Sequence, residues 1–218
     1  MTRENAIAVL ASGGLDSCAL LADLTRSHEV FPLYVRQGLA WEEAERAALD
    51  RFVGAVASPN LHPVTTIPLP VEAMYGRHWS VTGEGVPAAT DPDEKVYLPG
   101  RNVLLLAAAG VWCAVNGVRR VAMGTLGGNP FPDATSEFFA DYARLLTTAM
   151  SHPIEVVTPY REMRKHELIV RSADFPLHLT LTCNAPRGGQ HCGACNKCYE
   201  RRSAFARAGV EDKTAYTA

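Results

Sequence analysis

Short apolar runs alternate with amphipathic segments along most of this chain. Apolar runs of this kind predict buried strands, and apolar residues at helical spacing predict helices. The expected strands are residues 6–11, 30–35, 64–69, 119–125 and 154–158. The expected helices are residues 18–24, 41–57, 101–117, a helix that ends at Met150, and residues 164–173. The alternation predicts an α/β fold with a Rossmann-like, doubly wound, mostly parallel five-stranded sheet.

Two stretches depart from this alternation. Residues 70–100 carry Gly, Pro, Asp and Thr with little periodicity, so we expect a long irregular segment there. Such segments are usually lids, binding elements or disordered. Residues 177–182 are expected to be extended. We expect one compact unit, with an α/β domain at residues 1–176 and a small C-terminal tail at residues 177–218 packed on it.

A polar loop, Ser-Gly-Gly-Leu-Asp-Ser at residues 12–17, follows the first predicted strand. Backbone N–H groups of such a turn, together with the positive end of the next helix, attract a phosphate, and glycines let it approach closely. Ser12 and Ser17 can donate to phosphate oxygens, whereas Asp16 suits a helix cap or a phosphate-bound magnesium ion. An ordinary strand-to-helix turn is the alternative.

This loop is neither a Walker A loop nor a Gly-x-Gly-x-x-Gly motif. It resembles the PP-loop of the ATP pyrophosphatase superfamily, whose members split ATP between the α and β phosphates and adenylate a substrate. In parallel sheets, ligands bind beyond the carboxyl ends of the strands. We therefore expect residues 12–17, 37–38 and 127–133, which follow three of the predicted strands, to converge on one pocket.

Four of the six cysteines cluster near the C-terminus, with the spacing C-x8-C-x2-C-x2-C. They are Cys183, Cys192, Cys195 and Cys198. In a reducing compartment such a cluster indicates a metal rather than disulfides. A structural zinc site with four thiolate ligands is the leading interpretation. An iron–sulfur cluster is the serious alternative, because C-x2-C-x2-C also occurs there, and chance clustering is a third.

Composition excludes several classes of protein. The chain has 218 residues, is 47% hydrophobic and carries a net charge of −2, so it has no basic footprint for stable nucleic-acid binding. No apolar run reaches the roughly 20 residues of a membrane helix. The first five residues lead directly into the first predicted strand, which leaves no room for a signal peptide, and we expect a cytoplasmic protein.

Four motifs occur together: the PP-loop, the cysteine array, Leu-Pro-Gly-Arg-Asn at residues 98–102, and the tail at residues 195–205. Over nearly the whole chain, this combination resembles the 7-cyano-7-deazaguanine synthase (QueC-like) family. The resemblance implies an ATP-dependent C–N ligase of queuosine biosynthesis. Such an enzyme converts 7-carboxy-7-deazaguanine and ammonia to the amide and then to the nitrile (preQ0), releasing AMP and pyrophosphate. It also implies magnesium, a structural zinc and a homodimer.

The resemblance assigns expected roles to residues of this chain. Those implied for ATP binding are Leu10, Ala11, Ser12, Gly13, Gly14, Leu15, Asp16, Ser17, Arg101 and Asn102. Those implied for catalysis are Ser12, Asp16, Ser17, Arg101 and Lys165. The alternatives are a surface position at the start of a helix for Arg101 and a solvated position on a helix face for Lys165.

Substrate binding is expected from Gln37, Phe131 and Asp133. A carboxylate such as Asp133 can accept two N–H bonds from a guanine-like edge, although an Asp there also suits a helix cap. Phe131 could stack on a base or simply pack in the core.

Both expected substrate loops depart from the family pattern. The family usually carries Tyr-Pro-Asp-Cys-Arg where residues 131–135 read Phe-Pro-Asp-Ala-Thr, and Tyr-Gly-Gln-Arg-His where residues 34–39 read Tyr-Val-Arg-Gln-Gly-Leu. The enzyme could therefore stop at the amide, take a related deazapurine, or transfer the acyl group to another amine, such as one on a protein. A PP-loop tRNA sulfur-transfer enzyme and a non-catalytic nucleotide-binding module are the alternatives from other classes.

Overall fold

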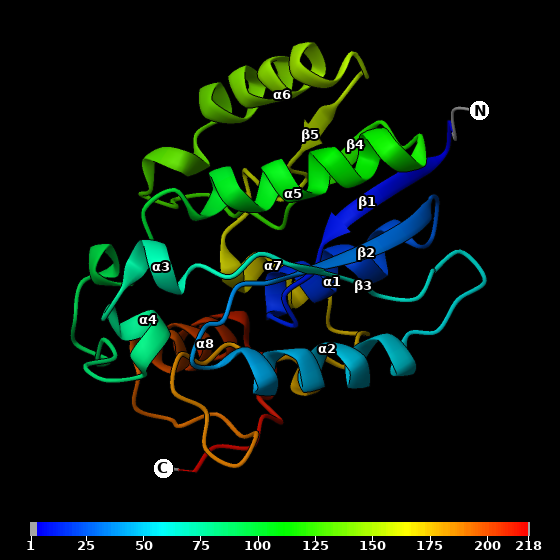
Figure 1. Ribbon diagram of the computed structural model, residues 1–218. Helices are drawn as coiled ribbons and strands as arrows, with labels where there is room; N and C mark the ends of the chain where they lie inside the picture. The colour runs from blue at the N-terminus through cyan, green and yellow to red at the C-terminus, as the bar shows by residue number, and fades with distance from the viewer. Residues whose placement is uncertain (1–3, 218) are drawn as a thin grey trace.

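Five parallel strands form the centre of the fold (Figure 1). The computed structural model describes residues 4–217, so residues 1–3 and 218, which end the two expected parts of the chain, lie outside the described residues. The strands run in the order β3-β2-β1-β4-β5, and every neighbouring pair is parallel. Their bounds are β1 Ala6–Leu10, β2 Glu29–Arg36, β3 Thr65–Pro68, β4 Arg120–Ala122 and β5 Glu155–Val157.

Helices cover both faces of this sheet, as Figure 1 shows. The helices are α1 Leu15–Leu24, α2 Glu42–Ala55, α3 Glu72–Tyr75, α4 Trp79–Thr82, α5 Arg101–Asn116, α6 Ser136–Met150, α7 Lys165–Arg171 and α8 Asn196–Ala208. Three short 3-10 turns are η1 Asp93–Val96, η2 Pro132–Ala134 and η3 Leu177–Leu179. Helices α5 and α6 pack on one face, and α1, α2, α7 and α8 pack on the other. No helix between residues 4 and 217 has the length and apolar character that a bilayer span needs.

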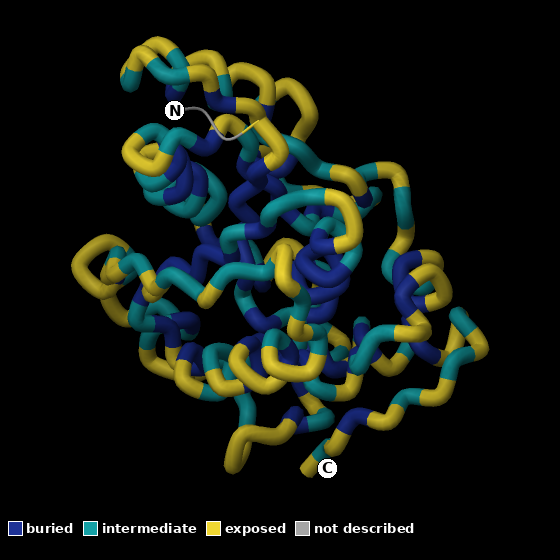
Figure 2. Tube along the Cα trace, turned by 90° about the vertical axis from the view of Figure 1, so that its right-hand side faces the viewer, coloured by how far each residue is buried: buried dark blue, intermediate teal, exposed yellow. Residues whose placement is uncertain are grey.

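The central strand explains why its sequence is uniformly apolar. Ile7 and Val9 of β1 point into the core beneath α1, whereas Ala6, Ala8 and Leu10 point into the core beneath α5. All five side chains are buried, because a parallel strand with helices on both faces meets no water. The dark interior in Figure 2 contains these two layers.

The predicted α/β architecture is confirmed, and the sheet is parallel throughout. The structure differs from prediction in the segments that lack a long periodic pattern of apolar residues. Residues 70–100 contain α3, α4 and η1, each only four residues long, which is too short to produce a periodic pattern. Residues 177–179 form a 3-10 turn rather than extended chain. Helix α8 was not predicted, because its buried face carries Cys198 and Arg201 beside Phe205.

The chain reverses its direction across the sheet between β1 and β4, and parallel sheets bind ligands at such a point. The PP-loop follows β1 there. Gly124 follows β4, and a Cβ on it would lie 2.9 Å from the Asp16 carbonyl. Glycine therefore lets the two loops pack directly against each other.

Helix α8 is fixed to the rest of the fold through a fully buried arginine. The Arg201 side chain has no exposed surface. Its guanidinium donates to Thr214 Oγ1 at 3.0 Å, to Thr180 Oγ1 at 2.9 Å and to the Leu177 carbonyl at 2.8 Å. A buried charge is tolerated only when its donors are satisfied in this way.

We expect Arg201→Met to lower the free energy of unfolding by about 3 kcal/mol, because it removes the buried donors and leaves their acceptors unpaired. Urea denaturation followed by circular dichroism measures this change. Arg207→Met, on the exposed side of the same helix, should change stability by less than about 0.5 kcal/mol. Equal stability of the two variants would contradict the anchoring role of Arg201.

Candidate functional site

A cavity of about 310 Å³ lies at the carboxyl ends of β1, β2 and β4. It brings together most of the side chains and backbone predicted for nucleotide binding and catalysis. The predicted residues that line it are Leu10, Ala11, Ser12, Gly14, Leu15, Asp16, Ser17, Arg101, Asn102 and Lys165. A second cavity, of about 600 Å³, adjoins it and shares Asp16, Lys165 and Lys197 with it.

The PP-loop is held in shape by its own hydroxyl groups. The Ser12 N–H donates to Ser17 Oγ at 3.1 Å, and the two hydroxyl oxygens lie 3.2 Å apart. Gly13 has φ +78°, and a Cβ on it would collide with the Glu45 carbonyl oxygen, so only glycine fits there. The loop thus packs against α2, while Ser12, Gly14, Leu15, Asp16 and Ser17 line the cavity.

Side chains of alternating charge connect α1, the helix that follows the PP-loop, to α7 and α8. Lys165 Nζ lies 3.3 Å from Asp16 Oδ2 and 2.6 Å from Glu200 Oε1, and Lys197 Nζ lies 2.8 Å from Glu200 Oε2. Burial alone would lower the pKa of Lys165, but the two carboxylates raise it above its ordinary value. Burial opposes the shift of Glu200 as well, yet the two lysines lower its pKa to about 2. Lys165 and Glu200 are therefore both charged at neutral pH.

Asp16 has one carboxylate oxygen free for a ligand. Asp16 Oδ1 is buried and has no hydrogen-bond partner among residues 4–217, whereas Oδ2 faces Lys165. Burial raises the pKa of this carboxyl, and Lys165 opposes the rise. An unpartnered oxygen beside a phosphate-binding loop fits a hard cation such as magnesium, which takes oxygen ligands from one or two carboxylates and from phosphates.

The first turn of α5 is fixed by two of the residues predicted to bind substrate. The Asn102 N–H donates to Asp133 Oδ2 at 3.0 Å, so Asp133 caps this helix from another segment. Arg101 Nε donates to Gln37 Oε1 at 3.2 Å. Neither Gln37 nor Asp133 lines either of the two cavities in the described structure, and their roles in binding substrate stay predictions.

Phe131, the third of these residues, lines the second cavity, where its ring lies 4.9 Å from that of Tyr97. Its role as a stacking partner for a base also stays a prediction.

Glu45 also lines the first cavity, and sequence reasoning missed it. The Tyr34 hydroxyl donates to Glu45 Oε2 at 3.4 Å. Burial raises the pKa of Glu45 to about 7, with Arg101 and Tyr34 opposing the rise. The acidic first turn of α2 gave no signal, because Glu42, Glu43 and Glu45 together are typical of any solvated helix start.

The four predicted metal ligands lie together and are buried. The Sγ atoms of Cys183, Cys192, Cys195 and Cys198 all lie within 4.8 Å of one another. The Cys192–Cys198 and Cys183–Cys195 sulfur distances are 3.9 and 4.0 Å. Four zinc–sulfur bonds in a tetrahedron would set neighbouring sulfurs about 3.8 Å apart. The set therefore fits a single ion better than an iron–sulfur cluster, which fills the space between its thiolates with several atoms.

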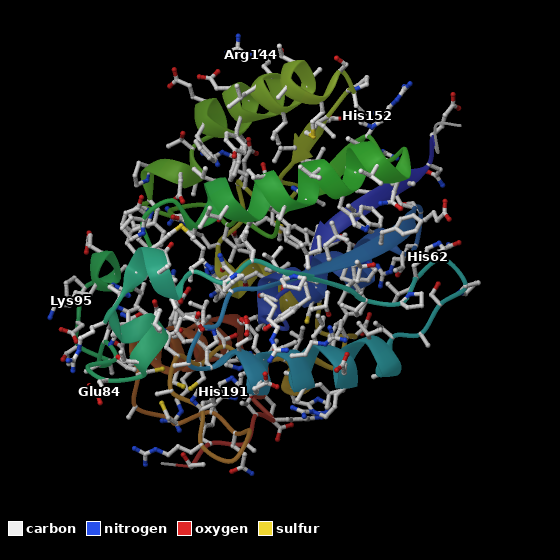
Figure 3. All side chains as sticks on the ribbon, in the orientation of Figure 1. His62, Glu84, Lys95, Arg144, His152 and His191 are labelled. Atoms are coloured by element: carbon white, nitrogen blue, oxygen red, sulfur yellow. The ribbon has the colours of Figure 1, made fainter. Side chains whose placement is uncertain are left out.

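His191 lies among the C-terminal loops that carry these cysteines (Figure 3). Its Nε2 accepts from the Thr182 N–H at 2.9 Å, so that nitrogen is engaged by the backbone. Cys183 and Asn184 themselves line the first cavity. The cysteine cluster therefore borders the first cavity.

An all-parallel α/β sheet with a PP-loop at its switch point defines a nucleotide-binding protein of the PP-loop type. A solved structure, of a predicted subunit of tRNA methyltransferase from Methanocaldococcus jannaschii, matches this fold with a TM-score of 0.51. That match covers 78% of this chain and 75% of the other at 15% identity, so it shows similarity of fold alone.

The family model for the queuosine biosynthesis protein QueC matches residues 6–209, and the chain belongs to that family. The 7-cyano-7-deazaguanine synthase of Methanothrix thermoacetophila is 31% identical, over 95% of this chain and 96% of the relative. The synthase of Dechloromonas aromatica is 33% identical, over 96% of this chain and 97% of the relative.

The sulfur spacing predicts about one tightly bound metal ion per chain. Cys195→Ser should lose most of this metal and lower the melting temperature, because a structural ion contributes directly to folding. Elemental analysis by mass spectrometry and calorimetry measure both effects. Cys113→Ala, which removes a buried thiol remote from the cluster, should keep the metal. The prediction would be contradicted by a wild-type protein that carries no metal and has the same melting temperature as Cys195→Ser.

Glu45→Gln should change how stability depends on pH. The folded-state pKa of Glu45, about 7, lies above its ordinary value of 4.5, so the wild type loses stability as pH rises between these values. The free energy of unfolding of the glutamine variant should therefore increase relative to that of the wild type across this range, by at most about 3 kcal/mol above pH 7. Denaturation at pH 4.5 and 8 measures the difference. Glu43→Gln, at an exposed position on the same helix, should show no such gain.

Proposed function

We propose that this protein is an ATP-dependent synthase that adenylates 7-carboxy-7-deazaguanine, or a close analogue. It then uses ammonia to form the amide and finally the nitrile. The observation that carries the proposal is the PP-loop at the cavity, with Asp16 Oδ1 buried and unpartnered beside it, in a chain of the QueC family.

The chain's own residues meet the demands of this reaction. A carboxylate is a poor acyl donor, and transfer of AMP to it creates a mixed anhydride that an amine can attack. A second adenylation, of the amide oxygen, followed by loss of AMP, gives the nitrile. The N–H groups and hydroxyls of residues 12–17 would hold the departing pyrophosphate, with Lys165 and Lys197 balancing its charge. Arg101 would lie near the phosphates or the acyl group.

Asp16 would hold magnesium through its free oxygen, and the ion would supply positive charge to the phosphates. For the four cysteines we propose a single structural zinc. All four ligand positions of such a site are filled by thiolates, so it would fold the tail rather than activate water.

We propose that Gln37, Phe131 and Asp133 contribute to binding the deazaguanine base. Gln37 and Asp133 would contribute indirectly, because they form hydrogen bonds with the first turn of α5, from which Arg101 reaches the cavity. Phe131 would contribute from the adjoining cavity, which it lines.

We further propose a cytoplasmic location, which suits six unpaired cysteines, and the homodimer that the resemblance implies.

A second candidate is transfer of the activated acyl group to another amine, such as one on a protein. The observation in its favour is the pair of altered loops: Tyr34 and Val35 of residues 34–39 line the first cavity, and Phe131 of residues 131–135 lines the second cavity of about 600 Å³. This candidate uses the same adenylation chemistry and differs only in the nucleophile.

The purified protein, incubated with ATP, magnesium, ammonium and 7-carboxy-7-deazaguanine, should yield the nitrile with AMP and pyrophosphate. Asp16→Asn should lower pyrophosphate release by at least about 100-fold, because it weakens charge stabilisation at the phosphates. Mass spectrometry and a pyrophosphate assay measure both results.

Other products would separate the alternatives. Amide alone would identify an enzyme that stops at the amide. A product with a different amine would identify the second candidate. Pyrophosphate release that depends on tRNA would favour sulfur transfer. Bound ATP without any turnover would indicate a nucleotide-binding module.

A further inference from the structure

Glu45 holds a fixed place beside the PP-loop that the nucleotide chemistry described so far does not use. The Gly13 backbone packs directly against the Glu45 carbonyl oxygen, which ties this turn of α2 to the loop. The Glu45 side chain lines the same cavity as Ser12 and Ser17. A carboxyl group is therefore held at the edge of the proposed adenylation site by elements that do not depend on substrate.

Glu45 differs from Asp16 and Glu200 in that no cation in the described part of the chain pairs with it directly. Asp16 and Glu45 are the two acidic residues that line the first cavity in the described part of the chain, and Asp16 is paired with Lys165. Across residues 4–217, no lysine or arginine nitrogen forms an ion pair with Glu45 within 4.0 Å. The cation that faces it, Arg101 on α5, donates through Nε to Gln37.

Its other neighbours are two aromatic side chains, a thiol and a second carboxyl group. Tyr34 of β2 donates to its carboxylate, and Trp41, just before α2, lines the same cavity. Glu42 is the charged neighbour on its own helix, and the buried thiol of Cys18 faces it from α1. A carboxylate flanked by aromatic rings suits a neutral amine nitrogen that becomes positively charged as it attacks, because ring faces attract positive charge.

We propose that the Glu45 carboxylate binds the nitrogen nucleophile and accepts a proton from it during attack on the adenylated carboxyl group. This inference rests on the proposed function. The nitrogen lone pair forms the new C–N bond, and the bond between the acyl carbon and the phosphate oxygen breaks, its electrons leaving with AMP. The positively charged nitrogen then gives one proton to Glu45, which leaves a neutral amide.

Acid–base considerations agree with this geometry. A proton acceptor works best when its pKa lies near the working pH, and the pKa of Glu45 is about 7. The lysine-paired Glu200, whose pKa is about 2, is a much weaker base.

The test separates adenylation from attack by nitrogen, using Glu45→Gln with Glu43→Gln as the matched control. Exchange of labelled pyrophosphate into ATP, with 7-carboxy-7-deazaguanine but no ammonium, should stay within a few-fold of wild type in both variants. Amide formation with ammonium should fall by about 100-fold or more in Glu45→Gln alone, as expected for loss of a general base. Hydroxylamine, a stronger nucleophile that is uncharged at pH 7, should restore product formation in that variant.

The pH profile supplies the readout that a merely structural role would not change. In the wild type, kcat/KM for ammonium should rise with an ionisation near pH 7, and Glu45→Gln should lack it. Glu45→Asp, which keeps the carboxylate, should retain the ionisation at a lower rate. An unchanged profile in Glu45→Gln, or equal loss of exchange and of amide formation, would overturn the inference. Absence of exchange in the wild type would instead overturn the proposed function, and the inference with it.

Discussion

The half-buried chain of charges from Asp16 through Lys165 and Glu200 to Lys197 determines how this site is built. Removing charged groups from water is costly, and each of these groups is tolerated because its neighbour has the opposite charge. The chain crosses from α1 to α7 and α8, so these three helices keep fixed positions around the PP-loop. It also leaves Asp16 one free oxygen, because Lys165 contacts only the other.

The C-terminal segment makes this arrangement possible. The Leu181 N–H donates to the Gly13 carbonyl at 2.8 Å, so the chain that leads to the cysteine cluster runs along the PP-loop. Arg201 anchors α8 from within the fold, and Cys198 lies on the same helix as Lys197 and Glu200. A metal held by the four thiolates would therefore fix the helix that supplies half of the charge chain. Its influence would reach the first cavity through this helix.

Local signals made part of this structure predictable. A strand buried on both faces must be apolar throughout, so β1 and the loop after it could be recognised from the sequence. Helix α8 could not, because its inward residues include an arginine whose partners, such as Thr180 and Thr214, are supplied by tertiary contacts alone. The cap that Asp133 provides to α5 spans 31 residues, which no local pattern encodes. The PP-loop and the cysteine array were visible because their chemistry depends on spacing within a short segment.

Three carboxyl groups around the two adjoining cavities show how environment divides their roles. Glu200, between two lysines, is held as a permanent anion and serves structure. Asp16, with one paired and one free oxygen, can serve a cation and still remain attached to its helix. Burial disfavours the charge of Glu45, while Arg101, Tyr34 and Trp41 favour it, and the pKa of this carboxyl is raised to about 7. A group whose charged and neutral forms are close in free energy can exchange a proton with a substrate, and the fold provides that condition beside the PP-loop.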